Sequence, residues 1–384
     1  MFRQLAAATA LTLLCAFQAQ IALARPYGLV EIHALSTGMS VFAPNADGGQ
    51  AVGGINLLSP KGINGSITHA MLQNGAAPAT DIHPTLLTTF QNSYASATDG
   101  IQQVGYGSGA RAAFVHALLW RGTADSAVDL NPSSLGITYS IAHGVGHGWQ
   151  VGLGYGVVTD FQFHAVVWAG TADSAVDLNP AGAVESLAVA TDGAGQVGYS
   201  RFVANGPNHA MLWAGTAASA VDLHPTTLGN LTHSIADGIG GGQQVGYGYN
   251  RTGTAIGHAL LWTGTADSVV DLNPNGQTNS SASATNGVNQ VGAGSGFGGD
   301  SNSHALVWSG TADSVVDLHV LLPAGLFSSS ADFIDAAGNV YGTARDGHAN
   351  LYAVEWAIPE PSSVYVLIAV ASMRLCRRGR IRRG

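Results

Sequence analysis

The chain has only two cysteines, Cys15 and Cys376, and each lies close to one end of the 384 residues. If both end segments are removed on export, the body between residues 25 and 358 contains no cysteine, so no disulfide can hold it together. The fold of the body must therefore depend on a packed core.

Basic side chains are scarce in the same body. It contains seven basic and twenty-two acidic residues, so its formal charge is 7 − 22 = −15, against −9 for the whole chain. A surface of this sign repels nucleic acids and anionic membranes. Neither is expected as a partner.

Long apolar runs are also missing. The two apolar stretches, residues 5–17 and 364–373, are shorter than the roughly 20 residues that span a bilayer comfortably. The body shows no long helical periodicity, and its 52 glycines with 46% hydrophobic residues favour short strands joined by tight turns. Nucleophile-elbow, His-Glu-x-x-His and phosphate-loop motifs are absent, so no catalytic residue is predicted.

The N-terminal 24 residues have the features of a secretory signal peptide. Arg3 precedes the apolar run, and Ala22 and Ala24 form a small-x-small site with cleavage expected after Ala24. The mature protein is therefore expected outside the cytoplasm.

The last 26 residues, 359–384, contain three ordered features: the tripeptide Pro359, Glu360 and Pro361, then the apolar run, then a basic tail that includes Arg374, Arg377 and Arg378. The segment resembles the PEP-CTERM sorting signal of Gram-negative bacteria. The resemblance implies recognition by a membrane exosortase, transient membrane contact, removal of the tail, and delivery to the cell exterior or outer surface.

Residues 25–358 consist of a repeat. Histidine followed by alanine marks it at His69, His116, His164, His209, His258, His304 and His348, with spacings of 47, 48, 45, 49, 46 and 44 residues. A regular period of this length is typical of a stacked or circular array.

Each unit contains four short segments, for example "SYASA", "QVGYG", "HALLW" and "AVDL", separated by turn residues in "TDG" and "GTADS". We therefore predict an all-β fold, a seven-bladed β-propeller of four-stranded antiparallel blades. The last unit lacks its fourth segment, whereas Val30 to His33 ("VEIH") matches it, so an N-terminal strand is predicted to close the ring. The alternative is an open β-solenoid with capped ends.

The units also resemble the HAF family of extracellular repeats. The matching text is "HALLW", "HAVVW", "HAMLW" and "HALVW", with Gln-Val-Gly upstream and Asp-Leu downstream. The third residue is Leu, Val or Met where the family has Phe. The resemblance implies a secreted or surface location and assigns no activity.

The recurrent histidines, tryptophans and aspartates are interpreted as structural. One histidine per blade would be spread around a ring and would not converge on a metal. We expect each histidine to contact a nearby polar group and each tryptophan to fill the space between blades. The residues concerned are His116, Trp120, Asp129, His164, Trp168, Asp177, His209, Trp213, Asp222, His258, Trp262, Asp271, His304, Trp308 and Asp317. No cofactor is expected, and weak Ca²⁺ binding at some turns stays open.

One face of the ring is predicted to vary between units. In an antiparallel meander the second–third and fourth–first connections emerge on the same side, and here both differ in length and content. Aromatic residues of this face are its candidate ligand contacts: Phe161, Phe163 and Phe202, with Phe114 and Phe297. Each could instead pack against its own blade.

Together these features predict a secreted, non-enzymatic repeat protein that binds or scaffolds in the extracellular polysaccharide or envelope layer. Two alternatives remain: a propeller enzyme acting on polysaccharide, as a lyase or glycosidase, and a structural coat protein.

Overall fold

The computed structural model describes residues 27–35, 39–44, 50–57, 67–109, 115–229, 231–250, 257–297 and 301–357. These residues form only strands and short 3-10 turns, and none of their helices is long and apolar enough to cross a membrane. The predicted signal peptide with Ala22 and Ala24 lies outside the described residues. So does the predicted sorting signal with Pro359, Glu360, Pro361, Arg374, Arg377 and Arg378.

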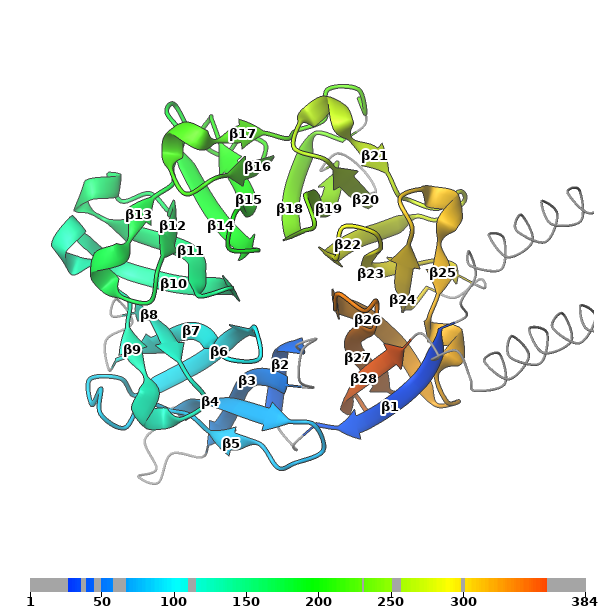
Figure 1. Cartoon of the computed structure of the whole chain (residues 1–384), viewed down its shortest axis with the longest axis horizontal. Coiled ribbons are helices and arrows are strands. Elements are labelled where there is room, and N and C mark those ends of the chain that lie inside the picture. Colours follow the sequence, from blue (N-terminus) through cyan, green and yellow to red (C-terminus); the bar gives the residue numbers. More distant parts are fainter. Residues whose placement is uncertain are drawn as a thin grey trace, which may run out of the picture. The chain divides into compact units, whose positions relative to one another are not determined.

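Contacts divide the chain into a small unit, residues 1–30 and 356–384, and a large unit, residues 31–355. In the large unit, antiparallel four-stranded meanders follow one another around a ring, and the first strand of each meander lies nearest the centre (Figure 1). The predicted all-β fold and four-stranded unit are therefore confirmed.

The first four meanders form four separate sheets. The first contains β2 (Met39–Pro44), β3 (Gln50–Leu57), β4 (Ile67–Asn74) and β5 (Thr80–Asp81). The second contains β6 (Asn92–Thr98), β7 (Gln103–Ser108), β8 (Val115–Trp120) and β9 (Val128–Asp129). The third contains β10 (Ile137–Gly146), β11 (Trp149–Gly156), β12 (His164–Trp168) and β13 (Val176–Asp177). The fourth contains β14 (Glu185–Thr191), β15 (Gln196–Arg201), β16 (His209–Trp213) and β17 (Val221–Asp222).

The next two meanders share one eight-stranded sheet. The first comprises β18 (His233–Gly240), β19 (Gln243–Tyr249), β20 (Gly257–Trp262) and β21 (Val270–Asp271). The second comprises β22 (Asn279–Thr285), β23 (Gln290–Ser295), β24 (Ser303–Trp308) and β25 (Val316–Asp317). A single parallel bridge between Gly257 and Asn279 joins them. The described strands thus form five separate four-stranded sheets and one double sheet, which is not the predicted count of seven separate blades.

The fifth four-stranded sheet combines the two ends of the repeat region. It has the order β1 (Gly28–Ala34), β28 (Leu351–Ala357), β27 (Val340–Asp346) and β26 (Leu326–Ile334). Within the large unit, the Leu35 amide donates to the Leu351 carbonyl at 3.2 Å. The strand that contains the "VEIH" segment therefore occupies the edge position for which it was predicted.

Short 3-10 turns complete the meanders. Five follow the third strand at "GTADS" or its variant: η1 (Ala124–Ser126), η4 (Ala172–Ser174), η5 (Ala217–Ser219), η6 (Ala266–Ser268) and η8 (Ala312–Ser314). Three others are η2 (Ser133–Leu135), η3 (Val157–Thr159) and η9 (His319–Leu321).

A β-bulge in the first strand explains why the second segment reads Gln-Val-Gly. In β10 the register against β11 shifts between Ala142 and Gly144, so His143 is an extra residue. The bulge places the Ile141 carbonyl oxygen beside Gly152, where an added Cβ would lie 1.9 Å from it. Only glycine leaves room for that carbonyl. The corresponding carbonyl lies 1.9 or 2.0 Å from the Cβ position of the equivalent glycines Gly105, Gly198, Gly246, Gly292 and Gly342.

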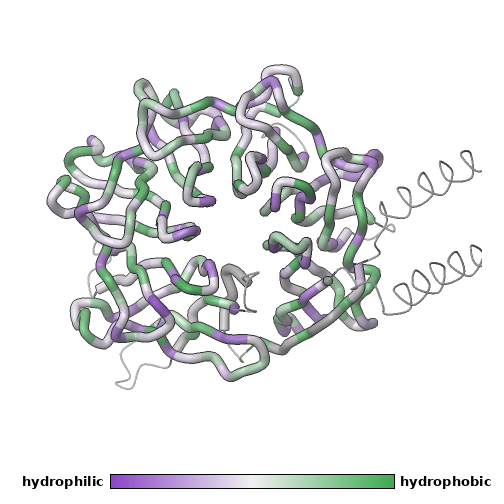
Figure 2. The backbone as a smooth tube through the Cα atoms, in the orientation of Figure 1, coloured by the Kyte–Doolittle hydropathy of each residue, from purple (hydrophilic) through white to green (hydrophobic). Residues whose placement is uncertain are grey.

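The core lies between consecutive meanders. Trp168 of β12 is fully buried in a cluster that also contains Val104 and Leu119 of the preceding meander. From Ser140 to Gly146 of β10, buried positions alternate with partly exposed ones, as expected of a strand whose two faces differ in environment. Hydrophobic residues are distributed over all the meanders of the ring (Figure 2). The tryptophans of the repeat therefore fill the space between meanders.

Candidate functional site

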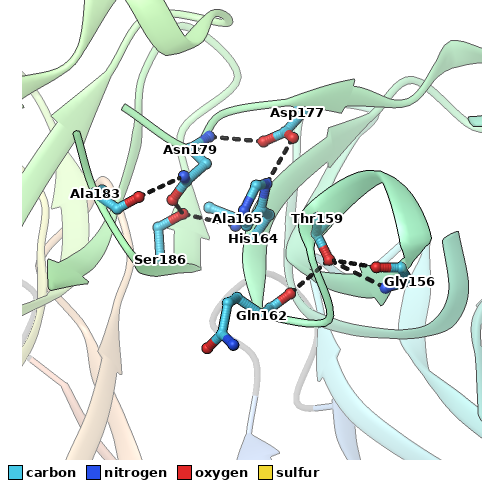
Figure 3. Close-up of polar contacts among 9 residues, drawn as sticks. All are labelled: Gly156, Thr159, Gln162, His164, Ala165, Asp177, Asn179, Ala183 and Ser186. Carbon is cyan, nitrogen blue, oxygen red and sulfur yellow. Dashed lines mark hydrogen bonds and ion pairs between the residues drawn. The ribbon is translucent and has the colours of Figure 1, made fainter. Parts of the chain in front are cut away.

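The recurrent histidines take part in a polar network that links each meander to the next. In Figure 3 the His164 ring donates from Nδ1 to Asp177 Oδ2 at 2.7 Å, and Asp177 Oδ1 accepts the Asn179 amide at 2.8 Å. Asn179 Oδ1 accepts from Ser186 Oγ of β14 at 2.7 Å, and the same Ser186 Oγ accepts the Ala165 amide at 2.9 Å. The network therefore satisfies buried backbone across the boundary between two meanders.

The same bonds recur around the ring. His-to-Asp contacts of 2.7 or 2.8 Å join His69–Asp81, His116–Asp129, His164–Asp177, His209–Asp222, His258–Asp271 and His304–Asp317. Amide-to-serine bonds join Ala70–Ser93, Ala117–Ser140, Ala165–Ser186, Ala210–Ser234, Ala259–Ser280 and Ala305–Ser329. A network repeated in six meanders has a structural role, and sequence reasoning missed its serine.

In three meanders a second histidine replaces the asparagine of the network. His83, His224 and His319 stack on the first histidine, with ring centroids 4.0, 4.3 and 4.2 Å apart. Burial lowers the pKa of His83 and of His224, and the neighbouring imidazole lowers both further. The folded state therefore favours the neutral imidazole at His83 and at His224.

The seventh repeat is marked by a tyrosine and not by His348. Trp356 is buried in β28. In five of the other repeats the marking histidine stands four residues before a tryptophan, as His116 does before Trp120, and in β28 this position is Tyr352. His348 lies in the exposed turn before β28. The prediction of His348 as the seventh mark was wrong, because His348 lies in a turn and not in the strand that carries the tryptophan.

Tyr139, Tyr155, Phe161 and Phe163 form what we call the aromatic patch, on the side of the ring where the variable connections emerge. The centroid of Tyr155 lies 5.6 Å from that of Phe161 and 5.5 Å from that of Phe163, and Tyr139 lies 6.1 Å from Phe163. Phe161 is 54% exposed and Phe163 is 41% exposed. The third meander therefore presents large apolar rings to solvent.

The loop that carries the two phenylalanines, residues 157–163 between β11 and β12, is held by its own hydrogen bonds (Figure 3). The buried Thr159 hydroxyl accepts the Gly156 amide at 3.1 Å and lies 2.7 Å from the Gln162 carbonyl oxygen. The Phe161 amide donates to the Gly156 carbonyl at 2.9 Å. Hydrogen bonds within residues 156–162 thus fix the conformation of the loop.

The backbone of Phe161 adopts a conformation that a bulky residue rarely takes. Its φ is +57°, and the preceding Asp160 has φ +49°. A left-handed conformation costs about 1–2 kcal/mol for a residue with a side chain, and such outliers cluster at functional sites. The fold therefore accepts a strained backbone at Phe161, a residue whose side chain is exposed and does not pack in the core.

The other aromatic candidates differ from the patch. Phe202 packs against the core cluster of the fourth meander and makes an edge contact with His209 at 5.5 Å. Phe297 packs against the cluster of the sixth and stacks on His304 at 5.9 Å. Phe114 lies outside the described residues. Of the candidates that the structure describes, Phe161 and Phe163 are the two that are strongly exposed.

A charged pair adjoins the patch. The Ser186 amide donates to the Phe163 carbonyl at 2.8 Å, which places the start of β14 beside the patch. There Glu185 forms an ion pair with Arg201 at 2.7 Å, and Arg201 Nε donates to Asn208 Oδ1 at 2.6 Å. The guanidinium is therefore engaged within the protein.

The bulges of the inner strands hold titratable side chains that differ from meander to meander, and sequence analysis did not single them out. Burial lowers the pKa of His143 to about 4 and raises the pKa of Asp237 to about 7. Burial also raises the pKa of Asp332 to about 6, opposed by a hydrogen bond from Ser330. Their only sequence signal is the change of residue type at one position of an otherwise regular segment.

Within the residues that the structure describes, no group of three or more His, Cys, Asp or Glu side chains is arranged to hold a metal ion.

The ring of four-stranded meanders defines the chain as a β-propeller, and solved structures agree. The β-propeller domain of the Trilobed protease from Pyrococcus furiosus, which has an open velcro topology, matches with TM-score 0.50 and 9% identity over 85% of this chain and 98% of that one. Puromycin hydrolase matches with TM-score 0.52 and 10% identity over 84% of this chain and 52% of that one. Neither a family model nor a curated protein sequence matches the chain. At these identities the likeness concerns the fold alone, and it favours the predicted propeller over the open solenoid.

Proposed function

We propose that the protein is a secreted, non-enzymatic binding module that attaches to extracellular polysaccharide through the aromatic patch. The observation that carries the proposal is Phe161, an exposed ring held at positive φ on a loop that its own hydrogen bonds fix. Aromatic rings on rigid supports provide binding area at little cost in conformational entropy.

We also propose that the ring has seven blades. The two meanders of the double sheet each pair their own strands throughout, and one bridge between Gly257 and Asn279 joins them. Counted as two blades, they bring the total to seven, with β1 as the outer strand of the last.

We base the proposed location on the two ends of the sequence. A signal peptide over residues 1–24 and a PEP-CTERM-like segment over residues 359–384 support export from a Gram-negative bacterium and processing by an exosortase. The envelope or the extracellular polysaccharide layer is where such a protein would act.

The test is binding of the protein produced from the full chain to a panel of polysaccharides, with and without Ca²⁺. We expect binding that the double substitution Phe161→Ala, Phe163→Ala weakens about tenfold or more. Phe327→Ala is the matched control, because Phe327 is also an exposed phenylalanine, at 55%, but lies in β26 away from the patch. A folded protein that binds no polysaccharide would contradict the proposal.

A second candidate function, cleavage of polysaccharide, would use Asp237 as its acid, because burial raises the pKa of this carboxyl group to about 7. A carboxyl group that is partly protonated at neutral pH can serve as the general acid in glycoside hydrolysis, whereas Asp332, with a pKa of about 6, is mostly ionised there. Shortening of a polysaccharide by the native protein but not by Asp237→Asn would replace the binding role with this one. A third candidate, the coat protein, would form ordered arrays when purified.

A further inference from the structure

We infer that the ligand of the aromatic patch is a neutral polysaccharide, bound as a single chain in solution. This rests on the proposed function and specifies its ligand class. The experiment distinguishes this ligand from an acidic polysaccharide, from the flat surface of an insoluble one, and from a second copy of this protein.

The charges around the patch disfavour an acidic ligand. Of the basic residues that the structure describes, only Arg201 belongs to the third or fourth meander, and it is engaged by Glu185 at 2.7 Å and Asn208 at 2.6 Å. The body as a whole carries a formal charge of −15, from seven basic and twenty-two acidic residues. A polyanion would be repelled by this field and would find no free cation among the described groups at the patch.

The orientation of the rings disfavours a flat surface. The planes of Tyr155 and Phe161 are inclined by 57°, those of Tyr155 and Phe163 by 45°, and those of Tyr139 and Phe163 by 55°. A flat polysaccharide face can stack on several rings only when the rings are nearly coplanar. Mutually inclined rings instead contact different sides of one chain, or successive sugars of a chain that twists.

The polar group beside the rings, the side-chain amide of Gln162, can hydrogen-bond with sugar hydroxyls. Gln162 lies between Phe161 and Phe163 in sequence, and its side-chain amide points away from the loop with no bond drawn to it (Figure 3). It is exposed and makes no side-chain hydrogen bond among the described residues. A primary amide offers donors and an acceptor without charge, which matches a sugar hydroxyl better than a carboxylate.

The experiment compares three ligands on the protein produced from the full chain. The probes are a soluble neutral glucan such as dextran or hydroxyethylcellulose, the polyanion polygalacturonate, and microcrystalline cellulose. Affinity electrophoresis and calorimetry measure the first two at about 50 mM and 500 mM salt, and a pull-down measures the third. Native protein, Phe161→Ala, Gln162→Ala and the control Phe327→Ala are run in parallel, and circular dichroism checks their folding.

We expect the neutral glucan to bind with an affinity that changes less than about twofold with salt, because no ion pair is formed. Phe161→Ala should weaken binding about tenfold and Gln162→Ala about threefold to tenfold, while Phe327→Ala should leave it unchanged.

Binding to polygalacturonate that weakens at high salt would overturn the inference while the proposed function stands. Retention on cellulose without binding to the soluble glucan would do the same. A dimer in light scattering that Phe161→Ala converts to monomer would also overturn it, because the patch would then be a self-interface. If the folded protein bound none of the three, the proposed function would fall with the inference.

Discussion

Substitution of Gly152 by alanine tests whether the bulge in β10 requires the glycine of the Gln-Val-Gly segment in β11. The new Cβ would lie 1.9 Å from the Ile141 carbonyl oxygen and 2.9 Å from the Ala142 Cα, both of them backbone atoms of β10. Neither atom can move without displacing the inner strand. Gly152→Ala should therefore lower the free energy of unfolding by about 3 kcal/mol, the upper end of the usual cost of overpacking a core.

Two other glycines separate this clash from the general effects of a glycine substitution. Gly148 has open space around its Cβ position but φ +85°, so Gly148→Ala should cost about 1–2 kcal/mol through the backbone alone. Gly229 has open space and no positive φ, so Gly229→Ala should be neutral or stabilise by up to about 1 kcal/mol.

Urea unfolding followed by tryptophan fluorescence measures all three, because the buried tryptophans become exposed when the meanders separate. The expected order of destabilisation is Gly152→Ala, then Gly148→Ala, then Gly229→Ala. A Gly152→Ala protein as stable as Gly229→Ala would refute the reasoning, since the bulge carbonyl would then not occupy that space.

Two further predictions concern the polar groups. Ser186→Ala removes the acceptor of the buried Ala165 amide and should lower the free energy of unfolding, measured in urea titrations, by about 1–3 kcal/mol. The control Ser134→Ala, at an exposed serine, should change it by less than about 0.5 kcal/mol. Equal stability of the two variants would contradict the role of the network. His143 has a folded pKa of about 4 against an ordinary 6.5, so the unfolded chain binds its proton first as the pH falls. Above about pH 6.5 the histidine is neutral in both states and does not lower the free energy of unfolding; as the pH falls from 6.5 toward 4, its protonation in the unfolded chain lowers that free energy progressively. When the pH is lowered from 7.5 to 4, the free energy of unfolding of His143→Gln should therefore rise by up to about 3 kcal/mol relative to that of the native protein. A difference between the two proteins that does not change with pH would refute this.

The repeat was readable in the sequence because its signals are local. Glycine and aspartate in "TDG" and "GTADS", the alternation in "HALLW", and the period of 44–49 residues each depend on neighbouring positions, so strand content and the four-stranded meander could be predicted. The likeness of "VEIH" to "VDLH" likewise indicated which strand lies beside β28. His348 misled for the same reason, because a local pair of letters does not say whether it lies in a strand.

The aromatic patch could be predicted only in part. Phe161, Phe163 and Phe202 all stand in variable connections, and nothing local distinguishes the first two, which are exposed, from Phe202, which packs against the core of its meander. Tyr139 and Tyr155 stand in strands and were not recognised, because their place beside the loop arises from the pairing of β10 with β11.

By itself, the sequence determined the class of fold, the repeating unit and the residues of its core and turns, because these depend on contacts within some 50 residues. Tertiary structure alone decided which phenylalanines face solvent, which serine completes the His–Asp–Asn network across two meanders, and which bulged side chains have displaced pKa values. Each of these depends on atoms that neighbouring meanders bring together, and chain spacing does not reveal which meander faces which side chain.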